Sequence, residues 1–345
     1  MIYCEDLSIS NISVHRIGSK ANNDGIIASK ESMQLDDALS SLLVHYFVTP
    51  FKSNEYFTLY HETDISLNEV YTYVTTILDN PDSLHEQSVN LAKHLYENSN
   101  HPKIKAGEFY VVHFKDCILD GETVDAVGIF KSENKDTFLK VYHQEEGVEL
   151  ESQEGVNINK LDKGCMIFNT EKDNGYVVAV IDNTNKGGEA HYWIDDFLHL
   201  KQRQDEYFNT ENVLSMCKNF VTKELPQHFD VSKADQVDML NKSVKFFKEK
   251  DSFDISEFTT EVMAQSDIID TFTQYKDTYQ RDRDIEIADN FMISDTAVKK
   301  QARSIKSVIK LDRNFHIYVH GDRELIETGI DERGKFYKVY YNEES

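Results

Sequence analysis

The sequence is poor in cysteine and proline and has no long apolar run. Its four cysteines are scattered without a Cys-x-x-Cys pair, which argues against a disulfide framework or a structural zinc site and favours buried, reduced thiols. These cysteines are Cys4, Cys117, Cys165 and Cys217. No apolar run approaches the ~20 residues that a membrane helix needs, and the N-terminus has no signal-peptide core. We therefore expect a cytoplasmic protein without a membrane anchor.

Motifs for common catalytic chemistry are also absent. The Gly187–Gly188 pair lacks the surroundings of a phosphate-binding loop, and neither a Gly-x-Ser-x-Gly elbow nor a His-Glu-x-x-His motif occurs. His191 and His199 flank two aspartates, but on a helix they would lie ~12 Å apart along the axis, too far to share one ion. We expect no enzymatic activity, no metal and no cofactor, with an enzyme of non-standard site as the alternative.

Positive charge is scarce. The chain has 345 residues with 61 acidic and 37 basic side chains, so its formal net charge is −24. Such a charge opposes non-specific contact with phosphate backbones or anionic lipid. Any nucleic-acid binding must therefore come from a local basic patch. With 40% hydrophobic and 11% aromatic residues, the chain can still build a substantial core.

Three helical patterns in the first hundred residues end shortly before prolines, which cannot extend a helix. The apolar residues recur at helical spacing over 39–46, 67–78 and 84–95, followed by Pro50, Pro81 and Pro102. We expect the first helix to be capped by Asp36 and the others by two capping boxes, Ser66-x-x-Glu69 and Ser83-x-x-Glu86.

Short β-rich runs surround these helices. Residues 12–17 alternate like a half-buried strand, with 25–29 as the hairpin partner. Turn clusters such as 172–175 separate the later strands, which we expect at 109–117, 126–130, 137–142, 165–169 and 176–182. Sequential strands at this spacing predict an antiparallel meander rather than βαβ units.

From about Thr210 the helical period returns, and the last fifty residues are β-rich again. We expect helices over 213–221, ended by Pro226, over 237–247, capped at Ser232, and over 268–279. Terminal strands are expected at 304–311, 315–320 and 335–341. The predicted fold is α+β: a mixed N-terminal domain (1–205) with antiparallel strands and three helices, a helical segment (206–295) and a small basic C-terminal β-segment (296–345).

The sign of the charge reverses near the C-terminus. Residues 116–196 hold 18 acidic and 7 basic side chains, and residues 249–295 hold 13 and 4. Residues 299–323 hold 7 basic side chains against 2 acidic ones, a local net charge of +5, with His316, His320, Phe315 and Tyr318 among them. The basic residues are Lys299, Lys300, Arg303, Lys306, Lys310, Arg313 and Arg323.

Two local geometries would gather this positive charge on one surface. If Ser294 caps a helix, one stripe forms from the basic residues at spacings of 4, 3 and 4, which are Lys299, Arg303, Lys306 and Lys310. If a strand begins near Ser304, which we favour, Lys306 and Lys310 share one face of a hairpin that ends at Arg313. Such a surface is either a solvated face that balances the acidic body or a phosphate-contacting site.

Two segments resemble the bacterial family of nucleoid-associated proteins of the NdpA or YejK type. They are ISVHRIGSK at 12–20, followed by the Asp36 helix, and YWIDDFLHLKQRQDEYFNTENVLSMCKNFV at 192–221. The matching residues in the second segment are Tyr192, Trp193, Phe197, Leu198, Arg203, Phe208 and Phe220. The closing part, 304–341, is similar to that family's terminal strand-rich segment. The resemblance implies a DNA-related, non-enzymatic role in the bacterial nucleoid.

We therefore expect a nucleoid-associated, non-catalytic protein that contacts DNA weakly and without sequence specificity through the seven basic residues. The alternative is an acidic adaptor that docks on a basic DNA-processing protein without binding DNA itself. Both hypotheses allow a homo-oligomer, and neither involves a membrane.

Overall fold

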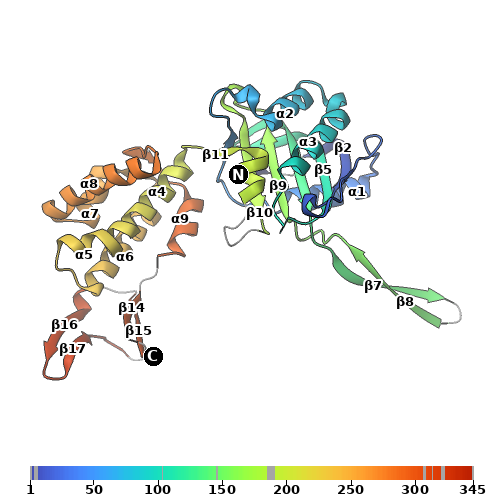
Figure 1. Ribbon diagram of the computed structural model, residues 1–345. Helices are drawn as coiled ribbons and strands as arrows, with labels where there is room; N and C mark the ends of the chain where they lie inside the picture. Colours follow the sequence, from blue (N-terminus) through green and yellow to red (C-terminus); the bar gives the residue numbers. More distant parts are fainter. Residues whose placement is uncertain are drawn as a thin grey trace. The chain divides into compact units, whose positions relative to one another are not determined.

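The computed structural model describes residues 2–3, 7–102, 104–144, 147–184, 191–305, 308–312, 314–319 and 323–343. The chain divides into two units, Met1–Arg203 (unit 1) and Gln204–Ser345 (unit 2) (Figure 1). Unit 1 holds a large antiparallel sheet and unit 2 is mainly helical, so the α+β prediction is confirmed. No helix in the described residues is long and apolar enough to cross a membrane.

Unit 1 is built on a nine-stranded sheet in the order β11-β4-β10-β9-β6-β5-β2-β3, with β1 paired to β5. Its strands are β1 (Ile2–Tyr3), β2 (Ser8–Ile17), β3 (Ile26–Ile27), β4 (Phe57–Leu59), β5 (Gly107–Leu119), β6 (Glu122–Ser132), β9 (Lys163–Phe168), β10 (Val177–Asp182) and β11 (Leu200–Gln202). The described pairings within it are antiparallel, and β5, β6, β9 and β10 are neighbours in chain order. The predicted antiparallel meander is therefore confirmed for four of its five strands, whereas the strand predicted at 137–142 does not join this sheet.

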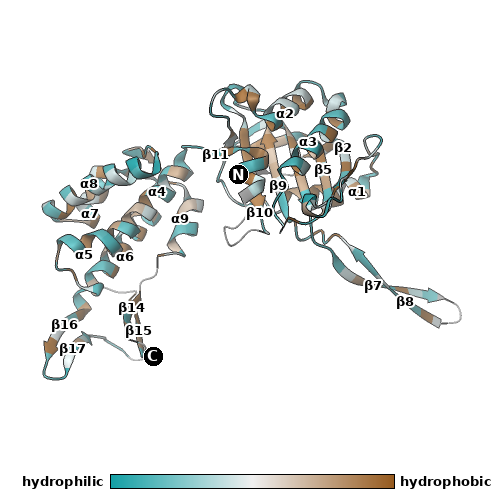
Figure 2. Ribbon diagram, viewed as in Figure 1, coloured by the Kyte–Doolittle hydropathy of each residue, from teal (hydrophilic) through white to brown (hydrophobic). Residues whose placement is uncertain are grey.

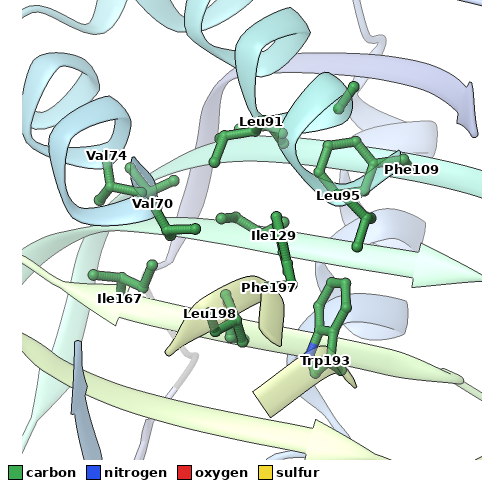
Figure 3. Packing of buried hydrophobic residues seen from close by; sticks show 14 of the residues in the cluster. Val70, Val74, Leu91, Leu95, Phe109, Ile129, Ile167, Trp193, Phe197 and Leu198 are labelled. Atoms are coloured by element: carbon green, nitrogen blue, oxygen red, sulfur yellow. The ribbon is translucent and has the colours of Figure 1, made fainter. Parts of the chain in front are cut away.

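Two hydrophobic cores lie on opposite faces of this sheet, because successive strand residues point to opposite sides. Phe109 and Val111 of β5 join a core with α2 (Glu69–Asp79) and α3 (Leu84–Asn98), part of which Figure 3 shows. Val112 and Phe114, which point to the opposite side of β5, join a second core with α1 (Asp37–Val48). The central strands are accordingly coloured as hydrophobic in Figure 2.

The N-terminal caps agree only in part with the sequence prediction. Asp36 caps α1 by accepting a hydrogen bond from the amide of the residue three positions later. The boxes predicted at Ser66 and Ser83 are wrong. Asn68 caps α2 instead, and Ser83 already has helical backbone angles because a short turn from Pro81 leads directly into α3.

The predicted turn at 172–175 depends on its glycine. Gly175 has φ +86°, and a Cβ placed on it would lie 2.0 Å from the carbonyl oxygen of Leu59. The Leu59 amide donates to the Gly175 carbonyl at 2.9 Å, so the turn lies directly against β4. A residue with a side chain is therefore excluded here by both backbone angle and space.

Between β6 and β9 the chain forms a separate hairpin. Strands β7 (Asp136–Gln144) and β8 (Gly147–Gly155) pair with one another in a two-stranded sheet and extend away from the body of unit 1 (Figure 1). The sequence predicted β7 but not β8, whose glutamates lower its apparent β propensity. We call this hairpin the arm.

The helices of unit 2 enclose one aromatic-rich core. They are α4 (Glu206–Asn219), α5 (Leu225–His228), α6 (Lys233–Glu249), α7 (Ile255–Val262), α8 (Ser266–Arg283) and α9 (Asp295–Ala302), with the short strands β12 (Ser252–Asp254) and β13 (Asn290–Met292). Ser232 caps α6 as predicted, through a capping box with Asp235. Val298 and Ile305 belong to this core, so α9 packs with the other helices.

Pro226 does not end its helix, which corrects the sequence prediction. A π-helical turn, Phe220–Glu224, connects α4 to α5, and the helical path continues to His228. Leu225 donates its amide to the carbonyl of Phe220, five residues earlier. Pro226 follows at the start of α5, where a missing amide is tolerated.

Two small hairpins complete unit 2. They are formed by β14 (Val308–Leu311) with β15 (Phe315–Tyr318), and by β16 (Ile326–Asp331) with β17 (Gly334–Val339). Ile309, Val319 and Ile326 pack against Ala234 and Val237 of α6 in a separate small core. The hairpins are thereby fixed to α6.

Candidate nucleic-acid interface

Helix α9 and the residue that follows it present two predicted basic residues to solvent. Ser294 accepts a hydrogen bond from the Ala297 amide at 3.5 Å, and Ala297 and Val298 turn into the core. Lys299 and Arg303 are four positions apart and exposed, and neither has an ion pair with another described residue. The helix ends at Ala302, so the stripe proposed to run on to Lys310 does not form.

Lys300 points to a different side of α9. Its ammonium group lies 3.2 Å from Glu211 of α4 and 5.4 Å from the centre of the Tyr207 ring. Gln301 donates to the same carboxylate at 2.8 Å. Lys300 is therefore engaged in an ion pair within unit 2.

Arg323 is also engaged within unit 2. Its Nε donates to Asp235 at 2.7 Å, and its guanidinium group donates to the carbonyl of Ile326. Burial alone would raise the pKa of Asp235, but hydrogen bonds from Ser232 and Arg323 outweigh burial and lower it. Arg323 thus ties the chain before β16 to the start of α6.

Lys310 lies on the outer face of the first C-terminal hairpin. This hairpin begins at Val308 and not near Ser304, because Ser304 still donates its amide to the Gln301 carbonyl at 2.9 Å in the turn after α9. Lys310 is opposite His316, and both are exposed while Ile309 is buried. Tyr318, 66% exposed, shares this outer face because it is two positions from His316.

Two of the seven predicted residues, Lys306 and Arg313, lie outside the described residues. The structure thus gives a position for five of the predicted basic residues. Lys299, Arg303 and Lys310 present charge to solvent, whereas Lys300 and Arg323 are used in ion pairs.

Sequence reasoning did not identify a row of lysines on α6. Lys242, Lys245 and Lys248 recur every three residues and are exposed. The first two lie 2.8 Å from Asp238 and 4.0 Å from Glu249 respectively. Asn241, one turn before Lys245 on the same face, donates to the Val319 carbonyl at the end of β15. In the sequence, the spacing of three residues between these lysines is the pattern that indicates the row.

Two basic residues near the C-terminal end of unit 1 are engaged in contacts within that unit. Lys201 lies over the Tyr60 ring at 5.2 Å, and Arg203 contacts Glu171 at 3.0 Å. The aromatic residues that carry the family resemblance are buried: Tyr192, Trp193 and Phe197 in unit 1, and Phe208 and Phe220 in unit 2. They build cores and form no part of this surface.

The described residues contain no group of three or more metal-ligating side chains that could hold an ion, at His199 or elsewhere. Cys117, Cys165 and Cys217 are buried. Burial raises the pKa of the Cys165 thiol, and that of Cys217 to about 12. The thiols of Cys165 and Cys217 are therefore protonated at neutral pH and poor nucleophiles.

The comparison with known families covers both units. Residues 13–345 match the family described as NA37, nucleoid-associated protein YejK, which is nearly the whole chain. No curated protein matches the chain.

Proposed function

The chain belongs to the nucleoid-associated protein YejK family, and we propose that it associates with DNA through the exposed basic residues of unit 2, without catalysis. The observation that carries the proposal is the local excess of positive charge between Lys299 and Lys310 in a chain whose net charge is −24. Lys299, Arg303 and Lys310 support it, because no described residue pairs with their charges.

The mode of binding follows from the residue types. Lysine and arginine attract phosphate oxygens and release condensed counterions, and this attraction carries no sequence information. His316 and Tyr318 beside Lys310 add polar and aromatic contacts but no pattern of base-reading side chains. We therefore propose sequence-independent binding to the phosphate backbone.

The affinity should be weak and sensitive to salt. Lys299, Arg303 and Lys310, which pair with no described residue, support about three to six phosphate contacts together with Lys306 and Arg313. Each phosphate contact contributes about −0.9 to the slope of log affinity against log salt. The expected slope is roughly −3 to −5. The acidic remainder of the chain repels the duplex, most of all at low ionic strength, where screening is weak.

The test is DNA binding measured by fluorescence anisotropy across a series of monovalent salt concentrations. The central variant replaces Lys299, Arg303 and Lys310 by glutamine and keeps Lys300 and Arg323, whose ion pairs stabilise unit 2. The magnitude of its salt slope should be about 2.7 less than that of the wild type, because three phosphate contacts are lost.

The matched control replaces Lys201 and Arg203, which are already engaged in unit 1, by glutamine. This variant should bind nearly as the wild type does. Equal losses in both variants would show that the surface is misplaced. If the unmodified protein does not bind naked DNA even near ~50 mM salt, the adaptor alternative replaces the proposal.

A further inference from the structure

The arm of unit 1 is covered by no other described strand. Its strands pair only with each other through nine residue pairs, and it projects from the body of unit 1 (Figure 1). An isolated two-stranded hairpin is at best marginally stable in water. A hairpin of this length therefore needs either strong cross-strand contacts or a covering surface.

One face of the arm is aliphatic. Val141 is opposite Leu150, Leu139 is opposite Ser152, and Val148 is opposite His143, and these pairs share a face because side chains alternate along a strand. The four aliphatic side chains are between 48% and 68% exposed. Exposed apolar side chains gathered on one face favour an interaction site there.

The charges of the arm lie mainly on the other face. Lys140 is opposite Glu151, and Tyr142 is opposite Glu149. The Tyr142 hydroxyl donates to Glu151 at 2.8 Å, and the Lys140 ammonium lies 4.8 Å from the Tyr142 ring centre. Among the described residues of the arm, Glu154 is the one carboxylate on the aliphatic side, and it lies at the root.

We propose that two copies of this chain pair through the aliphatic faces of their arms about a two-fold axis. Identical apolar faces are self-complementary in such an arrangement. Packed sheets lie ~10 Å apart, so the outward carboxylates of the two copies stay further apart than the ~8 Å Debye length at physiological salt. Like-charge repulsion is therefore screened.

The segregation of charge favours a second copy over a basic partner protein. Residues 136–155 hold six acidic side chains and one basic one, a net charge of −5. A basic partner would be drawn to the acidic face and would leave the aliphatic face exposed. A second copy covers the aliphatic face and leaves the acidic one in water.

The contact is small. Four aliphatic side chains from each copy cover far less than the ~800 Å² per partner of a standard interface. The dimer is therefore reversible, with a dissociation constant on the order of 10–100 μM. This inference uses no step of the proposed DNA binding.

Sedimentation velocity of the full chain tests this inference at concentrations up to several times that range, in buffer of physiological salt. The wild type should shift from monomer to dimer. Leu150→Asp, which puts a charge into the aliphatic face, should raise the dissociation constant at least tenfold. Gln153→Asp adds the same charge to the opposite face and should leave it within twofold of the wild type.

A crosslink provides the second readout. In a Cys4→Ser background, Val141→Cys should give a dimer with a short bismaleimide and the parent variant should not, since the remaining cysteines, Cys117, Cys165 and Cys217, are buried. A wild type that stays monomeric throughout the concentration range overturns the proposal. So does a dimer whose stability Leu150→Asp does not change, because its interface must then lie elsewhere.

Discussion

His15 should make unit 1 sensitive to mild acid. It is buried on β2, and the Ser29 amide donates to its Nδ1 at 3.1 Å. Nδ1 is therefore unprotonated, and Nε2, 2.7 Å from the Ser88 hydroxyl, carries the proton of the neutral ring. Burial first, and then the nearby His85, lowers the pKa of His15 to about 4.

The sign of the effect follows from linkage. Between the folded pKa of about 4 and an unfolded pKa near ~6.5, the unfolded chain binds more protons than the folded one. Stability contributed by neutral His15 is therefore complete above this window and lost as the pH falls through it. From pH ~7 to pH ~5 the loss from this residue is about 2 kcal/mol.

The assay is urea denaturation at the two pH values, followed by circular dichroism. His15→Asn keeps a neutral polar side chain but takes up no proton in this range, so its free energy of unfolding should fall by about 2 kcal/mol less than that of the wild type. Burial also lowers the pKa of His94 and His113, so these residues add to the total loss of stability. The test therefore compares the change in the free energy of unfolding between variants. His45→Asn, at an exposed position of α1, is the control and should change like the wild type. An unaltered pH dependence in His15→Asn would refute the reasoning.

Three further predictions concern packing. Gly175→Ala should destabilise the protein by at least ~1–3 kcal/mol in thermal or urea unfolding, because its Cβ would meet the Leu59 carbonyl at a positive φ. Phe197→Ala should reduce the free energy of unfolding by about 3–5 kcal/mol, since the ring is fully buried against Trp193; a loss under ~1 kcal/mol would contradict this packing. Cys117, Cys165 and Cys217 are buried and should react with Ellman's reagent only after denaturation; the test uses the Cys4→Ser variant, because Cys4 lies outside the described residues, and rapid reaction of this native variant would contradict their burial.

Much of the fold was predictable because its signals are local. The apolar period, the caps at Asp36 and Ser232 and the turn at Gly175 each depend on residues within a few positions of one another. The predictions were wrong where structure outside the local pattern determines the backbone conformation. Serine was expected to cap α3, but the turn that begins at Pro81 had already made Ser83 helical.

The candidate site was predictable only at the level of net charge. The sequence indicated which segment is positive, but not which cations remain available. Lys300 meets Glu211 and Arg323 meets Asp235 across large sequence separations, and no local pattern indicates such pairs. The lysine row that includes Lys245 was overlooked because the adjacent acidic segment dominated the charge balance.

The junction between α9 and the helical core determines how this surface can be dissected. Ala297, Val298 and Ile305 are buried, and Ile309 and Ile326 cover α6. A chain shortened at Ser294 would therefore lose its positive segment and also expose apolar surface on the remaining helices. Loss of DNA binding in such a truncation would reflect misfolding as much as missing charge. Side-chain neutralisation at Lys299, Arg303 and Lys310 separates the two effects, whereas removal of the segment does not.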